Sequence, residues 1–213
     1  MARVRVRQHV NPLSQKFQVV TTWPDWQQVY ADCDRPLHLD IGCARGRFLL
    51  AMATVQPEWN YLGLEIREPL VDEANAIARE RELTNLYYHF SNANLDLEPL
   101  LRSLPTGILR RVSIQFPDPW FKKRHQKRRV VQPELVQALA NALPAGAEVF
   151  LQSDVLDVQA AMCEQFAAEP RFQRTTSEWL PENPLPVPTE REIAVQNKQL
   201  PVYRALFIRQ PDH

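Results

Sequence analysis

Apolar runs alternate with helical patterns along the first half of the chain, and this alternation restricts the possible folds more than any other feature. Residues 37–41 and 61–66 are typical of buried strands, whereas residues 46–55 and 69–82 are typical of helices. The order strand, helix, strand, helix predicts a parallel sheet wound with right-handed crossovers.

The second half of the chain continues the pattern. Three more strands and two more helices are expected over residues 86–91, 112–116 and 148–152 and over residues 133–143 and 155–168. Residues 172–178 and 202–209 fit an antiparallel pair at the edge of the sheet. We therefore expect an α/β fold with a mostly parallel, twisted sheet of about seven strands, an antiparallel edge strand and helices on both faces.

The length and composition favour one domain with a basic extension. The chain has 213 residues, of which 45% are hydrophobic, so it can bury a substantial core. We expect a single domain over residues 17–213 and a basic arm over residues 1–16. The arm contains four basic residues and no acidic one: Arg3, Arg5, Arg7 and Lys16.

The sequence also predicts where the protein resides. No apolar run approaches the roughly 20 residues that cross a bilayer, and the first residues lack the apolar stretch of a signal peptide. Cys33, Cys43 and Cys163 are an odd number without C-x-x-C spacing, which predicts reduced thiols and no metal site. We expect a cytoplasmic protein without membrane contact, as a monomer or a homodimer.

A glycine turn follows the first predicted strand. Gly42 and Gly46 stand where the backbone must turn tightly and approach a ligand, but Ala44 replaces the middle glycine of the dinucleotide pattern G-x-G-x-x-G. Asp40, just before the turn, would repel a pyrophosphate and can hold an ammonium group. S-adenosylmethionine, which has an amino group and a sulfonium, fits this turn. Taken alone, the loop is equally compatible with a turn that binds nothing.

Two further polar residues follow successive strands. Glu65 ends the second predicted strand, where a carboxylate can accept hydrogen bonds from both hydroxyls of a ribose. Asn92 follows the third, and its amide can meet the edge of an adenine. Together with Asp40, these side chains occupy three successive strand ends, and this repetition favours a cofactor site over turn chemistry.

Asp118 is the candidate catalytic residue. Pro117 and Pro119 end the strand over residues 112–116, because proline lacks a ladder donor and fixes φ. Asp118 therefore lies at the carboxyl end of a strand, where open α/β sheets bind ligands. The alternative is that Asp118 only caps a turn.

A cationic run follows Asp118. Six of the eight residues from 122 to 129 are Lys or Arg, although the chain as a whole has 25 basic and 25 acidic residues. A local concentration of this kind is typical of a surface that binds a polyanion such as RNA, and the alternative is a solvated face. The cations are Lys122, Lys123, Arg124, Lys127, Arg128 and Arg129. Trp120 or Phe121 can stack on a base, although Trp120 can equally fill the core.

Phe116-Pro-Asp-Pro-Trp-Phe-Lys-Lys-Arg-His-Gln-Lys-Arg-Arg129 resembles the signature of the bacterial tRNA (guanine-N7)-methyltransferases of the TrmB type. Arg7-Gln-His9, Ser153-Asp154 and residues 189–192 support the resemblance, which covers nearly the whole chain. It implies the Rossmann-like class I methyltransferase fold. It also implies cofactor contacts from Asp40, Glu65, Asn92 and Asp118 and substrate contacts from Lys122, Asp154, Thr189, Glu190, Arg191 and Glu192.

The chain departs from the family pattern at three places. Asp40 and Asn92 stand where many members carry Glu and Asp, and Glu190-Arg191 stands where relatives often have Lys followed by an aromatic residue. Residues 189–192 are also compatible with a capping box at the start of a short helix. A capping role and a substrate contact remain equally open.

The resemblance implies methyl transfer from S-adenosyl-L-methionine to N7 of guanine-46 in the variable loop of tRNA, with S-adenosyl-L-homocysteine and 7-methylguanosine as products. N7 has a lone pair and no proton, so it can attack the sulfonium methyl directly. The enzyme would then act by alignment and electrostatics, without a metal. The alternatives are a noncatalytic RNA-binding protein on the same fold and a methyltransferase that acts on a protein or small molecule; a nicotinamide oxidoreductase is disfavoured by Ala44.

Overall fold

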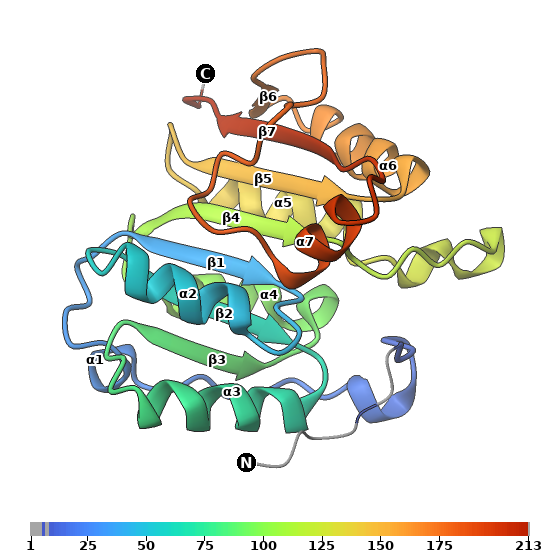
Figure 1. Cartoon of the computed structure of the whole chain (residues 1–213). Helices are drawn as coiled ribbons and strands as arrows, with labels where there is room; N and C mark the ends of the chain where they lie inside the picture. The colour runs from blue at the N-terminus through green and yellow to red at the C-terminus, as the bar shows by residue number, and fades with distance from the viewer. Residues whose placement is uncertain (1–5, 7–8, 213) are drawn as a thin grey trace.

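A seven-stranded sheet in the order β3-β2-β1-β4-β5-β7-β6 forms the centre of the computed structural model, which describes residues 6 and 9–212 (Figure 1). The strands are β1 (Leu37–Ile41), β2 (Asn60–Glu65), β3 (Leu86–Phe90), β4 (Leu109–Gln115), β5 (Glu148–Ser153), β6 (Phe172–Arg174) and β7 (Tyr203–Arg209). β1 to β5 pair in parallel, and β7 is antiparallel to both β5 and β6. The expected mostly parallel sheet with an antiparallel edge is confirmed.

Helices cover both faces of this sheet (Figure 1). They are α1 (Trp26–Val29), α2 (Arg47–Val55), α3 (Glu68–Glu80), α4 (Ala93–Ser103), α5 (Pro133–Ala142), α6 (Leu156–Ala167), α7 (Glu190–Gln196) and the 3-10 helices η1 (Gln15–Phe17) and η2 (Lys123–Arg128). One buried cluster joins α4, α5 and α6 to the sheet, and a second joins α2 and α3 to the opposite face. Within the described part of the chain, none of the helices has the length and apolar character needed to cross a membrane.

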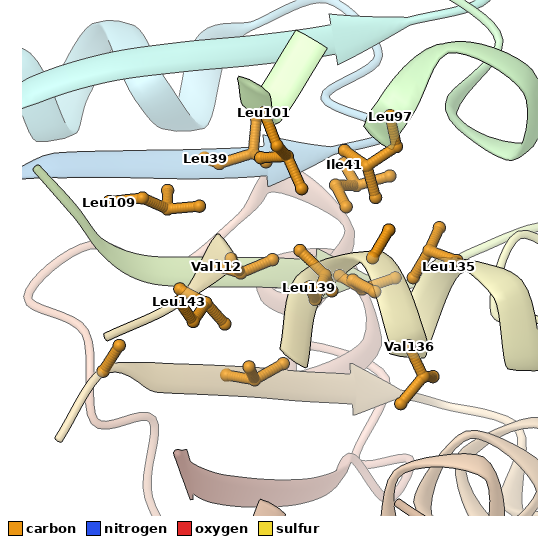
Figure 2. Close-up of a cluster of buried hydrophobic side chains, with 14 of the residues drawn as sticks. Leu39, Ile41, Leu97, Leu101, Leu109, Val112, Leu135, Val136, Leu139 and Leu143 are labelled. Carbon is orange, nitrogen blue, oxygen red and sulfur yellow. The ribbon is translucent and has the colours of Figure 1, made fainter. Parts of the chain in front are cut away.

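β1 shows how the central strands bury polar as well as apolar residues. All five of its residues are buried. Leu39 and Ile41 join the cluster beneath α4 and α5 (Figure 2), whereas the ring of His38 packs edge-on against Phe48 of α2, with 5.9 Å between ring centroids. Because both faces of the strand are covered, its polar residues are also buried. Asp40 is one of them and lies near the carboxyl edge of the sheet.

α4 was not predicted, although the sequence contains its signal. Leu97, Leu100, Leu101 and Leu104 are buried at the spacing of one helical face. Pro99 lies inside the helix. Because proline is disfavoured in helix interiors, it makes this pattern hard to recognise in the sequence. At the other end of the chain, β6 spans three residues and stops at Arg174, short of the predicted residue 178.

We predict that Gly63→Ala lowers the free energy of unfolding by about 1–3 kcal/mol, because it overpacks a filled site. An added Cβ would lie 2.5 Å from Cδ1 of Tyr88, a fully buried ring, and 2.7 Å from Sγ of Cys43. Urea unfolding measures the effect. Gly107→Ala is the control, because its Cβ would meet no atom within 4 Å and only its φ of +79° would be strained. Equal losses in the two variants would contradict the packing argument.

Candidate active site

A cavity of about 590 Å³ opens at the carboxyl ends of the central strands. Its lining contains most of the predicted cofactor residues, namely Asp40, Gly42, Glu65, Asn92 and Asp118. Predicted substrate residues from other parts of the chain reach the same cavity: Asp154, Thr189, Glu190 and Arg191. The volume lies within the range of small-molecule sites, roughly 300–1,000 Å³.

The two glycines of the turn after β1 have different roles. Gly42 lines the cavity with a φ of +84°, and an added Cβ would meet no atom within 4 Å, so the glycine keeps this wall open. Gly46 is absent from the lining, and its added Cβ would lie 2.4 Å from Cε1 of Tyr88. Packing against Tyr88 therefore requires a glycine at position 46, where ligand approach was predicted.

Asp40 is 4% exposed, and two neighbours orient its carboxylate. Oδ1 accepts hydrogen bonds from Oγ of Ser113 at 2.6 Å and from Nε2 of Gln115 at 3.2 Å. Burial raises the pKa of Asp40 to about 6, although these two bonds act in the opposite direction and the charge of Glu65 adds to the rise. At neutral pH the group is therefore largely ionised and can hold an ammonium group.

Glu65 is 3% exposed and already holds four hydrogen bonds. Oε1 accepts from the backbone N–H and Nε of Arg67, and Oε2 accepts from Nη2 of Arg67 and from the backbone N–H of Ala44, all at 2.8–2.9 Å. These bonds use the four acceptor positions of a carboxylate. A ribose at Glu65 would therefore take the place of the Arg67 guanidinium, a partner that the sequence analysis missed.

Asn92 anchors the N-terminal segment to the cavity wall. Its Nδ2 donates to the carbonyl oxygens of Pro12 at 3.1 Å and Phe17 at 3.0 Å. Both amide protons therefore serve main-chain acceptors, and Oδ1 is the group that remains for the edge of an adenine. His9 and Pro12 of this segment also line the cavity.

Asp118 lies on a strained stretch of backbone between its two prolines. Phe116 has a φ of +49° and Trp120 a φ of +44°, and bulky residues in the left-handed region cost roughly 1–3 kcal/mol each. The side chain of Asp118 is 38% exposed, and a hydrogen bond of 2.7 Å joins its Oδ1 to Nδ1 of His9. Strain maintained beside a partly exposed carboxylate supports a functional role over simple turn capping.

Two ion pairs connect α7 to the cavity rim. Arg191 pairs with Asp154, and Glu190 pairs with Arg47 at the start of α2. Both α7 residues, for which the resemblance implies substrate contacts, line the cavity. Arg47 is a further cavity residue that the sequence analysis did not identify.

Thr189 and Glu192 form the capping box that the sequence allowed. The Oγ1 of Thr189 accepts from the backbone N–H of Glu192 at 3.1 Å. Glu192 is 1% exposed and pairs with Nη2 of Arg204 at 2.7 Å. It is absent from the cavity lining, so the geometry supports a role in holding α7 in place.

The cationic run projects from the sheet as η2 and its flanks (Figure 1). Its exposed cations are Lys122, Lys123, Arg124 and Lys127. The other two hold the segment in place: the guanidinium of Arg128 lies 5.0 Å from the ring centroid of Trp120, and Nε of Arg129 donates to the carbonyl oxygen of Pro119 at 2.9 Å. Arg3, Arg5 and Arg7 lie outside the described residues.

Comparisons with known proteins decide the family. The model described as “Putative methyltransferase” (Methyltransf_4) matches residues 34–205. A protein of Synechococcus elongatus named tRNA (guanine-N(7)-)-methyltransferase is 96% identical over 211 residues, which are 99% of each chain. This chain belongs to the tRNA (guanine-N7)-methyltransferase family. A relative from Trichormus variabilis with the same name is 64% identical over 207 residues, 97% of this chain and 96% of its own.

Solved structures extend the comparison to the fold of the family. The 16S rRNA methyltransferase KamB superposes with a TM-score of 0.61 and 16% identity, and the match covers 91% of this chain and 99% of KamB. At this identity the likeness shows the fold alone, which is the class I methyltransferase fold expected for a tRNA (guanine-N7)-methyltransferase.

We predict that this family member loses affinity for S-adenosylhomocysteine as the pH falls through about 6, the pKa of Asp40. Because burial raises this pKa, the carboxylate becomes neutral below it and can no longer pair with the ammonium group of the ligand. Titration calorimetry between pH 7.5 and pH 5 should show a loss of roughly tenfold.

Asp40→Asn is the matched control for this titration. It should bind more weakly at pH 7.5 and show a much smaller pH dependence. An equally steep dependence in the variant would assign the titration to another group.

Proposed function

We propose that this protein transfers the methyl group of S-adenosyl-L-methionine to N7 of guanine-46 in the variable loop of tRNA, forming 7-methylguanosine, in the cytoplasm. The observation that carries the proposal is the position of Asp118. It lies in the wall of the cofactor-sized cavity and four residues before the first of the exposed cations. The names of near-identical relatives support the same reaction.

Four residues of the cavity lining suit particular parts of the cofactor. Asp40 offers a buried carboxylate to the amino group, and Gly42 leaves space along the wall. Asn92 offers Oδ1 to the adenine, and Glu65 can accept from the ribose once the Arg67 guanidinium has moved away. S-adenosylmethionine supplies an electrophilic methyl group on its sulfonium. The lone pair of guanine N7 needs no deprotonation, so the protein has to align the two groups and does not have to provide a base.

Asp118 and Asp154 are suited to orient the guanine. The hydrogen-bond donors of the base are N1–H and the N2 amino group, and a carboxylate is the natural acceptor for both. Asp118 contacts His9 and Asp154 contacts Arg191, so each carboxylate is held in place by a basic partner at the cavity. We propose that Asp118 is the catalytic positioning group and that Asp154 shares the recognition of the base.

The exposed cations of the η2 segment account for tRNA binding. Lys122, Lys123, Arg124 and Lys127 are exposed and would contact phosphates, which makes binding strongly dependent on salt. In A-form RNA N7 faces the deep, narrow major groove, so the target base must lie in an accessible loop or be displaced from its stack to reach the cavity. Phe121, which is 71% exposed and lines the cavity, is placed to stack on a displaced base.

The direct test is transfer of labelled methyl from S-adenosylmethionine to an unmodified tRNA transcript, followed by mass analysis of its nucleosides. The account predicts 7-methylguanosine in the native transcript and none when guanine-46 is replaced by adenine. Binding of both ligands without transfer would favour the noncatalytic RNA-binding alternative. Methylation of both transcripts would overturn the assignment of the site.

Substitutions should separate catalysis from RNA binding. Asp118→Ala is expected to lower kcat by roughly 100-fold or more, because it removes the group that aligns the base. Lys122→Ala should instead raise KM for tRNA several-fold and lower the salt dependence of binding by about one phosphate contact. Steady-state kinetics at two salt concentrations measure both effects.

The control for Lys122 is Lys198→Ala, which removes an exposed lysine beyond α7 and outside the cavity lining. It should leave kcat, KM and the salt dependence unchanged. An equal increase of KM in both lysine variants would indicate a general charge effect and would contradict a phosphate contact at Lys122.

A further inference from the structure

A continuous chain of side-chain hydrogen bonds crosses the carboxyl edge of the sheet from the cofactor cavity to α7. Nε2 of Gln115 donates to Oδ1 of Asp40 at 3.2 Å, and Oε1 of Gln115 accepts from Nε2 of Gln152 at 2.7 Å. The same Nε2 of Gln152 donates to Oε2 of Glu192 at 3.2 Å. The chain thus passes from β1 through β4 and β5 to the first turn of α7.

Strand register brings the two glutamines together. Gln115 of β4 is the parallel partner of Gln152 of β5, and side chains of directly paired residues lie on the same face of a sheet. Gln152 is completely buried. The contact therefore belongs to the fixed part of the fold and does not depend on a surface rotamer.

The orientation of the two amides is determined by the carboxylates at the ends. A reversed Gln152 amide would turn its oxygen toward the carboxylate of Glu192, and a reversed Gln115 amide would do the same at Asp40. The orientation observed leaves Oε1 of Gln152 buried without a hydrogen-bond partner among the described residues. The two carboxylates thus fix the direction of both amides, although an unpaired buried acceptor costs stability.

Both ends of this chain of hydrogen bonds influence the cavity, one directly and one through α7. Asp40 lines it directly, and both of its hydrogen bonds from described residues end at Oδ1, which leaves Oδ2 for a ligand. Glu192 does not reach the cavity but fixes the start of α7, whose Glu190 and Arg191 line the cavity and form its rim ion pairs.

We propose that Gln115 and Gln152 are positioning residues that couple cofactor binding at Asp40 to the placement of α7 at the tRNA site. The inference rests on the proposed function. A cofactor amino group at Oδ2 repositions the Asp40 carboxylate, and the two amides pass this change to Glu192. The two ligands therefore bind cooperatively, and by linkage each changes the affinity of the protein for the other by the same factor.

The test measures this factor directly. The affinity for an unmodified tRNA transcript is determined with and without saturating S-adenosylhomocysteine. The proteins compared are wild type and the variants Gln152→Met and Gln115→Met. Wild type should bind tRNA about fivefold or more tightly with the cofactor product present. Each variant should reduce this ratio to near one, and the double variant should equal either single one.

The matched control is Gln159→Met on α6. Gln159 is also completely buried, and its Nε2 donates to the carbonyl oxygen of Leu151 at 3.0 Å, outside the chain of amides. The Gln159→Met variant should lose stability and keep the wild-type ratio of tRNA affinities with and without S-adenosylhomocysteine. Gln152→Met is expected to fold, because Glu192 keeps its bonds from Arg204 and Asn183.

The possible outcomes separate the two claims. A wild-type protein that methylates tRNA but shows a ratio of one overturns the coupling and leaves the proposed function intact. An unchanged ratio in Gln152→Met and Gln115→Met, or an equal loss in Gln159→Met, also overturns the coupling. Absence of both tRNA binding and methyl transfer in wild type overturns the proposed function and the inference together.

Discussion

A buried carboxylate at the carboxyl edge of the sheet is the constraint around which the site is organised. Asp40 is almost fully enclosed, yet it must remain ionised at neutral pH if it is to hold an ammonium group. Ser113 and Gln115 of the neighbouring strand β4 provide the hydrogen bonds that favour the charged form. Because β1 and β4 are adjacent and parallel, their polar ends meet where the cavity opens, and this arrangement brings Asp40 together with its two hydrogen-bond partners.

The same edge of the sheet also positions the proposed catalytic residue and the proposed RNA-binding segment. β4 ends at Gln115, just before the two prolines around Asp118. The left-handed backbone at Phe116 and Trp120 then leads the chain out of the sheet into the η2 projection. In the proposed site the central strands would hold the cofactor, whereas the strained turn presents Asp118 and leads into a segment with four exposed cations. Alignment of a base that is already a nucleophile needs this kind of placement more than it needs acid–base chemistry.

The sequence predicted the strands and the polar groups at their ends, because burial on both faces and proline turns leave strong local patterns. It did not predict Arg67 at Glu65, Arg47 at Glu190 or the glutamine pair between β4 and β5. Arg67 is only two residues from Glu65, and its pairing depends on the local backbone after β2. The other two contacts, in contrast, depend on strand register and on segments that meet only in the folded chain. Asp40, for example, pairs with Ser113 across 73 positions of sequence. Gly46 was predicted to approach the cofactor, and the structure adds a packing requirement there, because an added Cβ would meet the ring of Tyr88.

The most direct test of the account is a crystal structure of the protein with S-adenosylhomocysteine. The account predicts that the ligand lies in the cavity, with its amino group within hydrogen-bond distance of Asp40 and its ribose at Glu65, where Arg67 has moved away from the carboxylate. A ligand bound elsewhere, or a ribose that leaves the Glu65–Arg67 pair intact, would contradict it.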